Sequence, residues 1–328
     1  MYGRDGFDVS ALVIVLLFLL GLALVIKGGD FFVDAATWIA EVSGIPKFLI
    51  GATIVSLATT LPELLVSLIA AAEGSIGIAV GNAVGSVTAN VGLIMGISVV
   101  CMASAIDRRQ QAFKFIMMAA AIALLYAFSA GGSLGTLGSI VMLAMFLAYM
   151  IESVMGARSA MRADSGDERP ARDRRTTLVN AAKFVLGVAG IVVGARLMVD
   201  YGTKLAELMG VPQEIIGATL VAVGTSLPEL VTTITALVKK QASLSIGNIV
   251  GANIIDLTLI LPLCSVVSGK ALPILRQNVL LDMPFCLALC LLAVVPPMIS
   301  GRFRKLQGAL MLGMYAVYIG LLVSGVAS

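Results

Sequence analysis

Long apolar segments separated by short polar ones make up this chain, and this pattern limits what it can fold into. Hydrophobic residues account for 59% of its 328 positions and charged residues for only 12%. Soluble domains are about 25% charged. A helix needs roughly 20 apolar residues to cross a hydrocarbon core about 30 Å thick. The sequence therefore predicts an all-α polytopic membrane protein with ten transmembrane helices, near residues 9–27, 44–71, 76–102, 113–131, 135–155, 177–199, 210–238, 244–268, 278–298 and 306–327.

Composition also excludes several kinds of site. The chain has no histidine, which rules out a Ser-His-Asp triad, an H-E-x-x-H zinc site and a histidine proton relay. Its four cysteines all fall in apolar segments, where buried small side chains are the expected role. A net charge of +3 is too weak to indicate a nucleic-acid partner.

An internal repeat relates the two halves of the chain. The segment GATIVSLATTLPE (51–63) matches GATLVAVGTSLPE (217–229) at eight of thirteen positions, with an offset of 166 residues. The same offset aligns GNAVGSVTAN (81–90) with GNIVGANIID (247–256). It also gives the first apolar run a counterpart in mid-chain, so we interpret that run as a retained helix rather than a cleaved signal peptide.

The distribution of lysine and arginine predicts the orientation of the helices. Basic residues gather in the segments 108–114, 158–175, 239–240 and 302–305, which we expect to be cytoplasmic, whereas 131–138 carries no charge. Because each half has five helices, an odd number, the halves insert with opposite orientation. Secondary transporters often have such inverted repeats, with the site at the midplane where broken helices meet. The predicted domains are a first repeat (1–156), a cytoplasmic linker (157–176) and a second, inverted repeat (177–328).

Four polar residues are expected at the centre of the membrane. Glu63 and Asn90 lie on either side of a predicted turn at 73–75, so an antiparallel hairpin puts both about 20 Å from that turn. Glu229 and Asp256 repeat the arrangement in the second half. One such acid could be a structural hydrogen-bonding group. Three acids in two matching motifs instead indicate a transport pathway, because a charge at the bilayer centre costs about 3 kcal/mol or more.

The neighbouring residues favour a cation. Pro62 should free the carbonyl of Ala58, and Thr59 lies one helical turn before Glu63. Glycines at 81, 85, 247 and 251 should let the facing helix approach closely. Hard cations such as Ca²⁺ take an all-oxygen set of six to eight ligands. Another acid, Glu152, lies near a predicted helix end and is expected to face the lipid headgroups.

The motifs TTLPE (59–63) and GTSLPE (224–229), each followed by a G-N-x-x-G partner, resemble the calcium/cation antiporter superfamily, in particular its prokaryotic sodium/calcium exchanger branch. The resemblance implies exchange of Ca²⁺ for Na⁺ by alternating access. It also implies that Glu63 and Glu229 are shared carboxylates, that Thr59 and Thr225 are calcium ligands, and that Asn90 and Asp256 complete the central layer. Ser56, Thr60, Ser86 and Ser226, with the carbonyl of Ala222, would form flanking sodium sites.

The chain departs from the superfamily pattern at Ala252, which lacks the hydroxyl that Ser86 offers at the equivalent position. This departure leaves open a Ca²⁺/H⁺ or K⁺-coupled exchanger of the same superfamily. A cation channel and an intramembrane enzyme remain as alternatives of other classes.

No catalytic residue or cofactor is expected. The expected partners are the lipid bilayer and inorganic cations, with no nucleic acid and no obligate protein partner. We expect a multi-pass protein of a bacterial-type inner membrane with both termini on the non-cytoplasmic side.

Overall fold

The computed structural model describes residues 9–74, 76–102, 105–163, 173–208 and 226–324, and these are almost entirely helical. Within these ranges, eight helices are long and apolar enough to cross a membrane, and a bent pair of helices makes a ninth if it is counted as one span. A shorter apolar helix, α12 (Leu227–Val238), follows residues 209–225, which lie outside the described ranges. The predicted class, a helical multi-pass membrane protein, is confirmed, while the count of ten helices stays a prediction.

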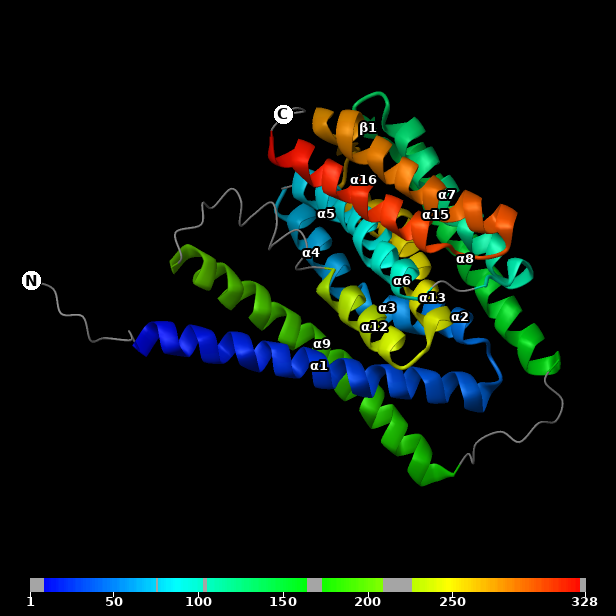
Figure 1. Cartoon of the computed structure of the whole chain (residues 1–328). Coiled ribbons are helices and arrows are strands. Elements are labelled where there is room, and N and C mark those ends of the chain that lie inside the picture. Colours follow the sequence, from blue (N-terminus) through cyan, green and yellow to red (C-terminus); the bar gives the residue numbers. More distant parts are fainter. Residues whose placement is uncertain (1–8, 75, 103–104, 164–172, 209–225, 325–328) are drawn as a thin grey trace, which may run out of the picture.

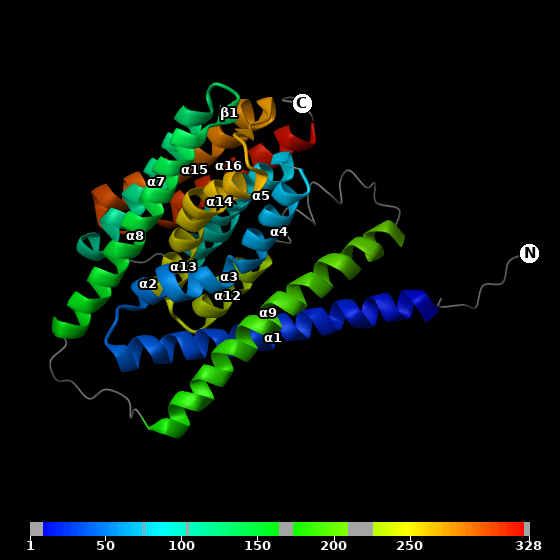
Figure 2. The ribbon, with the colours of Figure 1, turned by 180° about the vertical axis from the view of Figure 1, so that it is seen from behind.

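Two long helices, α1 (Val9–Ser43) and α9 (Arg174–Leu208), cross on one side of a bundle formed by the other helices (Figures 1 and 2). The predicted spans 9–27 and 177–199 are therefore too short. Each helix has 35 residues and is about 52 Å long, so it must tilt strongly or extend beyond a 30 Å core. Asp30 and Asp34 interrupt the apolar run of α1 without ending the helix, because a helix satisfies its backbone hydrogen bonds internally.

Glycines bring α1 and α9 into contact backbone to backbone. A Cβ atom on Gly21 would lie 2.9 Å from the carbonyl oxygen of Gly194, and one on Gly28 would lie 2.9 Å from that of Gly187. In the 166-residue repeat, Gly187 is the counterpart of Gly21 and Gly194 that of Gly28. Crossed contacts of this kind are expected when two similar halves pack about a two-fold axis, and small residues permit them.

Two continuous spans occupy the centre of the bundle. The first consists of α5 (Ile76–Ala89), the π-helical turn η2 (Asn90–Met95) and α6 (Gly96–Cys101). The second consists of α13 (Ala242–Ile255), η4 (Asp256–Ile260) and α14 (Leu261–Ser268). Their most apolar windows are 72% and 78% buried, against 44% or less in the other described spans, so these two segments are interior. The two π-helical turns begin at the predicted site residues Asn90 and Asp256. Single π-helical turns occur often at functional sites of proteins.

The predicted break before Glu63 is confirmed. The segment α2 (Lys47–Ile50), η1 (Gly51–Val55) and α3 (Ser56–Thr59) is bent by 44° from α4 (Leu61–Ala72). Pro62 causes the break because it has no N–H to donate and its ring clashes with the carbonyl four residues earlier. Pro228 has the same position in α12, directly before Glu229.

The remaining helices surround this centre. They are α7 (Arg108–Ser129), α8 (Thr136–Ala163), α15 (Met283–Ser300), which follows the π-helical turn η5 (Asn278–Asp282), and α16 (Lys305–Val323). A two-residue antiparallel pairing joins the halves between β1 (Ser133–Leu134) and β2 (Leu272–Pro273), in the register Ser133 to Pro273 and Leu134 to Leu272.

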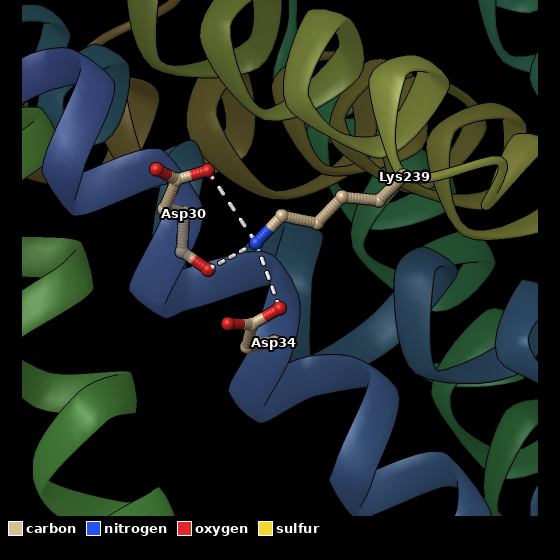
Figure 3. A network of polar contacts seen from close by, with 3 residues as sticks. All are labelled: Asp30, Asp34 and Lys239. Carbon is tan, nitrogen blue, oxygen red and sulfur yellow. Dashed lines mark hydrogen bonds and ion pairs between the residues drawn. The ribbon is translucent and has the colours of Figure 1, made fainter.

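An ion-pair network fastens α1 to the end of α12 (Figure 3). The ammonium of Lys239 lies 2.7 Å from Asp34 Oδ1 and 3.4 Å from Asp30 Oδ1, and it donates to the Asp30 carbonyl at 2.9 Å. The three side chains are 25–47% exposed, so each ion pair contributes about 1 kcal/mol or less. The network therefore orients α12 against α1 more than it stabilises the fold.

A second ion pair lies inside the bundle. Lys114 on α7 is fully buried and pairs with Glu152 on α8, and its ammonium is 5.9 Å from the ring centroid of the buried Tyr149. Glu152, which we expected to face the headgroups, is thus only 32% exposed and holds an interior cation. A buried ammonium requires such a partner, because an unpaired one is strongly destabilising.

Replacing Glu152 by glutamine is expected to lower the thermal stability of the detergent-solubilised protein clearly, since it leaves Lys114 buried without a counter-charge. Breaking a buried pair costs about 3–5 kcal/mol, and partial exposure of Glu152 puts the loss at the lower end. The double variant Lys114→Met/Glu152→Gln should recover most of the loss in melting temperature. The control is Glu41→Gln, which removes an exposed acid paired with Lys47. Equal melting temperatures for Glu152→Gln and Glu41→Gln would contradict the prediction.

Candidate cation-binding site

Two glutamates sit at equivalent helix starts in the two halves. Glu63 is in the first turn of α4 and Glu229 in the first turn of α12, and each is 1% exposed. The positive end of each helix dipole favours a negative charge at this place. Neither oxygen of Glu63, and only one of Glu229, has a hydrogen-bond partner among the described residues. Both side chains thus carry free acceptor oxygens in the interior.

The π-helical turns add two more polar side chains to this layer. Asn90 and Asp256 are each 1% exposed, and both Asp256 oxygens and Asn90 Oδ1 lack a partner within the described part of the chain. The carboxylate of Glu63 interacts electrostatically with those of Glu229 and Asp256. The structure therefore brings together the three predicted acids, and it places Asn90 in contact with Asn253, three residues before Asp256.

The acids alone do not make a metal site. Among the described residues, no three Asp, Glu, Cys or His side chains converge closely enough to hold a metal ion by themselves. Any cation here would also need hydroxyl, amide and carbonyl oxygens, which is the mixed set that Ca²⁺ and Na⁺ accept more readily than transition metals do.

Hydroxyl groups of the first half reach across to the second half. Thr60 Oγ1 donates to Glu229 Oε1 at 3.4 Å, and Thr59 Oγ1 donates to Asn248 Oδ1 at 3.1 Å. Both threonines are buried in the bent segment around the break, so this break presents them to α12 and α13. The cross-connections link residues that are 169 and 189 positions apart in the sequence.

The predicted flanking residues differ in their surroundings. Ser86 and Ser226 are buried, and their hydroxyls have no partner within the described ranges. Ser56 is fully buried, but its hydroxyl already donates to the Thr53 carbonyl at 3.1 Å. Thr225 and Ala222 lie outside the described residues, so their part in the site stays a prediction.

Two glycines of α13 make the close packing around Thr59 possible. A Cβ atom on Gly247 would lie 2.2 Å from the carbonyl oxygen of Phe48, and one on Gly251 would lie 2.5 Å from Ser56 Oγ. The predicted role of these glycines is thus confirmed. For Gly81 and Gly85 no described atom lies within 4 Å of such a Cβ, and the facing segment expected from the repeat falls within 209–225.

Three asparagines belong to the site but are missing from the predicted set. Asn82 Nδ2 donates to the Glu63 carbonyl at 3.3 Å and to Ser67 Oγ at 3.0 Å, while Asn248 accepts from Thr59. Asn253 accepts from Asn90 Nδ2 at 3.1 Å. Asn82 and Asn248 are the asparagines of the G-N-x-x-G motifs, so the repeat contained a signal for them. Nothing in the sequence indicated which side chain Asn253 contacts.

Chemically, the arrangement offers carboxylate, amide and hydroxyl oxygens from both halves in a buried layer. Burying several acids is costly unless a positive charge compensates them. The free oxygens and the negative charge fit a hard cation such as Ca²⁺ or Na⁺, which binds oxygen ligands of this kind.

Known proteins share this sequence pattern. The family model described as "Sodium/calcium exchanger protein" matches residues 13–155 and 179–324, two ranges that begin 166 residues apart. The sodium/calcium exchanger MaX1 of Methanosarcina acetivorans is 31% identical, over 93% of this chain and 97% of its own length. The inner membrane protein YrbG of Escherichia coli is 33% identical, over 77% of this chain and 79% of its own.

The fold is similar as well. A solved structure of the sodium-calcium exchanger NCX_Mj, soaked with Na⁺ and Sr²⁺, matches with a TM-score of 0.81 and 28% identity. The match covers 94% of this chain and 98% of that one. With two matched family ranges, relatives that align over nearly their whole length and the same fold, this chain belongs to the sodium/calcium exchanger protein family.

Proposed function

We propose that this chain is a secondary active antiporter that exchanges Ca²⁺ for Na⁺ across the membrane by alternating access. One observation carries the proposal: three buried acids from both halves, Glu63, Glu229 and Asp256, share a layer with oxygen atoms that no described residue binds. Buried acids inside a membrane are expensive and typically mark an ion pathway. Family membership supports exchange over the alternatives of a channel or an enzyme. We propose no catalytic residue and no cofactor.

The proposed ligands are those that the resemblance implies, and the unpartnered oxygens of Glu63, Asn90 and Asp256 support them. Glu63 and Glu229 would serve both ions, with Asn90 and Asp256 completing the central layer. Thr59 and Thr225 would add hydroxyl ligands to Ca²⁺. The flanking sodium sites would use the hydroxyls of Ser56, Thr60, Ser86 and Ser226 with the carbonyl of Ala222. The Ser56 hydroxyl donates to the Thr53 carbonyl, and this leaves its oxygen lone pairs available for a cation.

We call the oxygen ligands of Glu63, Glu229, Asn90 and Asp256 the cage. Competition of Ca²⁺ and Na⁺ for this one cage would give coupled exchange rather than a leak of either ion. An empty cage has up to three negative charges, and such a charge in a region of low dielectric resists the rearrangement that would move it across. Either one Ca²⁺ or several Na⁺ can neutralise the acids. Thr60 in the first half donates to the Glu229 carboxylate in the second half. A cation bound by this carboxylate would compete with the Thr60 hydroxyl for the lone pairs of the Glu229 oxygens. Ion binding would thereby be coupled to the contact between the halves.

The orientation and location also remain part of this proposal. Basic segments at 108–114, 158–175, 239–240 and 302–305 favour the cytoplasmic side. Both termini would then face away from the cytoplasm, in a bacterial-type inner membrane. Lipid and inorganic cations are the only partners that we propose.

Calcium-45 uptake into proteoliposomes tests the proposal. Separate samples receive an opposing gradient of Na⁺, of K⁺ or of pH as the only driving force. We expect uptake that depends on Na⁺ loaded inside the vesicles and stops when the gradient is dissipated. Uptake driven only by the pH step or by K⁺ would show that H⁺ or K⁺, and not Na⁺, is the coupling ion. Ala252, where the expected hydroxyl is missing, would then be the first residue to test. Calcium flux without any counter-ion requirement would indicate a channel and would overturn the antiporter.

A further inference from the structure

Asn253 is a buried side chain that belongs to none of the proposed ligand sets. It lies on α13, is fully buried and accepts a hydrogen bond from Asn90 Nδ2 at 3.1 Å through its Oδ1 atom. Its own Nδ2 donates to Met118 Sδ on α7 at 3.4 Å. Both ends of the Asn253 amide are therefore used, and its orientation is defined from two sides.

The bond from Asn90 to Asn253 decides which end of the Asn90 amide is left free in the interior. An amide carries one acceptor oxygen and one NH₂ donor, and a half-turn about its last torsion exchanges the two. Only the oxygen can bind a cation, whereas the NH₂ group would present positive partial charge to it. With Nδ2 held by Asn253, Asn90 Oδ1 remains without a partner among the described residues in the buried layer.

The repeat contains its own comparison. Asn90 corresponds to Asp256, and Asn253 corresponds to Val87, which is fully buried and apolar. A carboxylate has two equivalent oxygens and no N–H, so turning it over changes nothing and no acceptor is required beside it. Thus the amide of Asn90 in the first half is paired with an acceptor, Asn253, in the second half. The repeat position that corresponds to Asn253 in the half without this amide is the apolar Val87.

We propose that Asn253 is a positioning residue, which holds the Asn90 amide so that its oxygen, not its nitrogen, points at the transported cation. The inference rests on the proposed function of the layer as a cation site. It also gives a reason for a polar residue at 253 in a place where the repeat tolerates valine. Removing the acceptor should let the Asn90 amide turn over and should weaken cation binding without removing any ligand.

A double-mutant cycle separates this role from simple packing. The variants are Asn253→Val, Asn90→Asp and the combination of both, and the measurements are calcium-45 exchange kinetics and Ca²⁺ binding by calorimetry in detergent. In the Asn90 background, Asn253→Val should raise the KM and the Kd for Ca²⁺ about tenfold, the effect of one lost hydrogen bond to a ligand. In the Asn90→Asp background the same change should have less than about a threefold effect, because a carboxylate needs no orientation.

Conservative and remote variants complete the design. Asn253→Thr has the shape of valine but keeps a neutral oxygen that can accept from Asn90 Nδ2, so it should recover part of the KM and Kd lost in Asn253→Val. Asn180→Val removes another buried asparagine, whose Nδ2 donates to the Thr176 carbonyl one turn earlier in α9, and should change neither value. If Asn253→Val weakens binding equally in both backgrounds, or in neither, the positioning role is wrong.

Measuring both Ca²⁺ binding and Ca²⁺ exchange distinguishes a failure of the Asn253 proposal from a failure of the proposed antiport. If the protein binds Ca²⁺ but does not exchange it, the proposed function fails while the cycle on the Kd still decides the role of Asn253. If it binds no cation at all, both proposals fall.

Discussion

Replacing Glu63 by glutamine is expected to reduce Na⁺-driven calcium uptake severely, by at least about 30-fold. Glutamine has nearly the same shape, but it removes one negative charge from the buried layer and turns one acceptor oxygen into an NH₂ donor. Losing one member of a buried charge pair costs about 2–5 kcal/mol, which is roughly 30- to several-thousand-fold in affinity. Because neither Glu63 oxygen is engaged by a described residue, the loss should fall on ion binding rather than on folding.

The measurement is calcium-45 uptake at matched protein density, together with the melting temperature in detergent. The matched control is Glu73→Gln, which removes an exposed acid directly after the last residue of the same helix, α4. The control should transport normally, and both variants should melt like the unmodified protein. If Glu63→Gln transports normally, Glu63 does not bind the ion. If Glu73→Gln is equally inactive, the loss in Glu63→Gln cannot be assigned to the cage.

Replacing Gly247 by alanine is expected to destabilise the protein severely, by about 3 kcal/mol or more. The added Cβ atom would lie 2.2 Å from the Phe48 carbonyl oxygen and 3.0 Å from the Ala52 nitrogen. Both are backbone atoms in the bent segment, so no side chain can turn away to make room. Overpacking of a core usually costs about 1–3 kcal/mol, and backbone contacts on two sides put this position at the upper limit.

The effect should extend to ion binding, because Asn248 is the next residue and accepts from Thr59 across the same contact. Folded material of Gly247→Ala should therefore bind Ca²⁺ more weakly, and its melting temperature should drop by many degrees. Gly320→Ala on α16 is the control, since no described atom lies within 4 Å of its added Cβ and alanine is the better helix former. Equal melting temperatures for the two variants would show that α13 can move away from the bent segment at little cost.

The same contact illustrates which parts of the site were predictable. The repeated TLPE-type motifs predicted Glu63, Glu229, Asn90 and Asp256 in one layer. The structure brings the three acids together and buries Asn90 beside Asn253. Proline at 62 predicted the break, because its missing N–H and its ring act on the local backbone whatever surrounds it. Glycines at 247 and 251 were predicted to permit close approach, but the atoms that they approach were not.

Sequence alone thus determined the membrane class and the break before Glu63, and it predicted the two-half organisation and the central residues. Each of these depends on local properties or on a pattern that recurs at a fixed offset: apolar length, the chemistry of proline and the repeat of 166 residues. Only the tertiary structure decided that Thr60 donates to Glu229, that Asn90 donates to Asn253 and that Lys114 pairs with Glu152. It also showed that α1 continues to Ser43. Contacts between distant segments depend on how helices cross and rotate against one another, and apolar periodicity leaves that rotation undetermined because nearly every face of these helices is apolar.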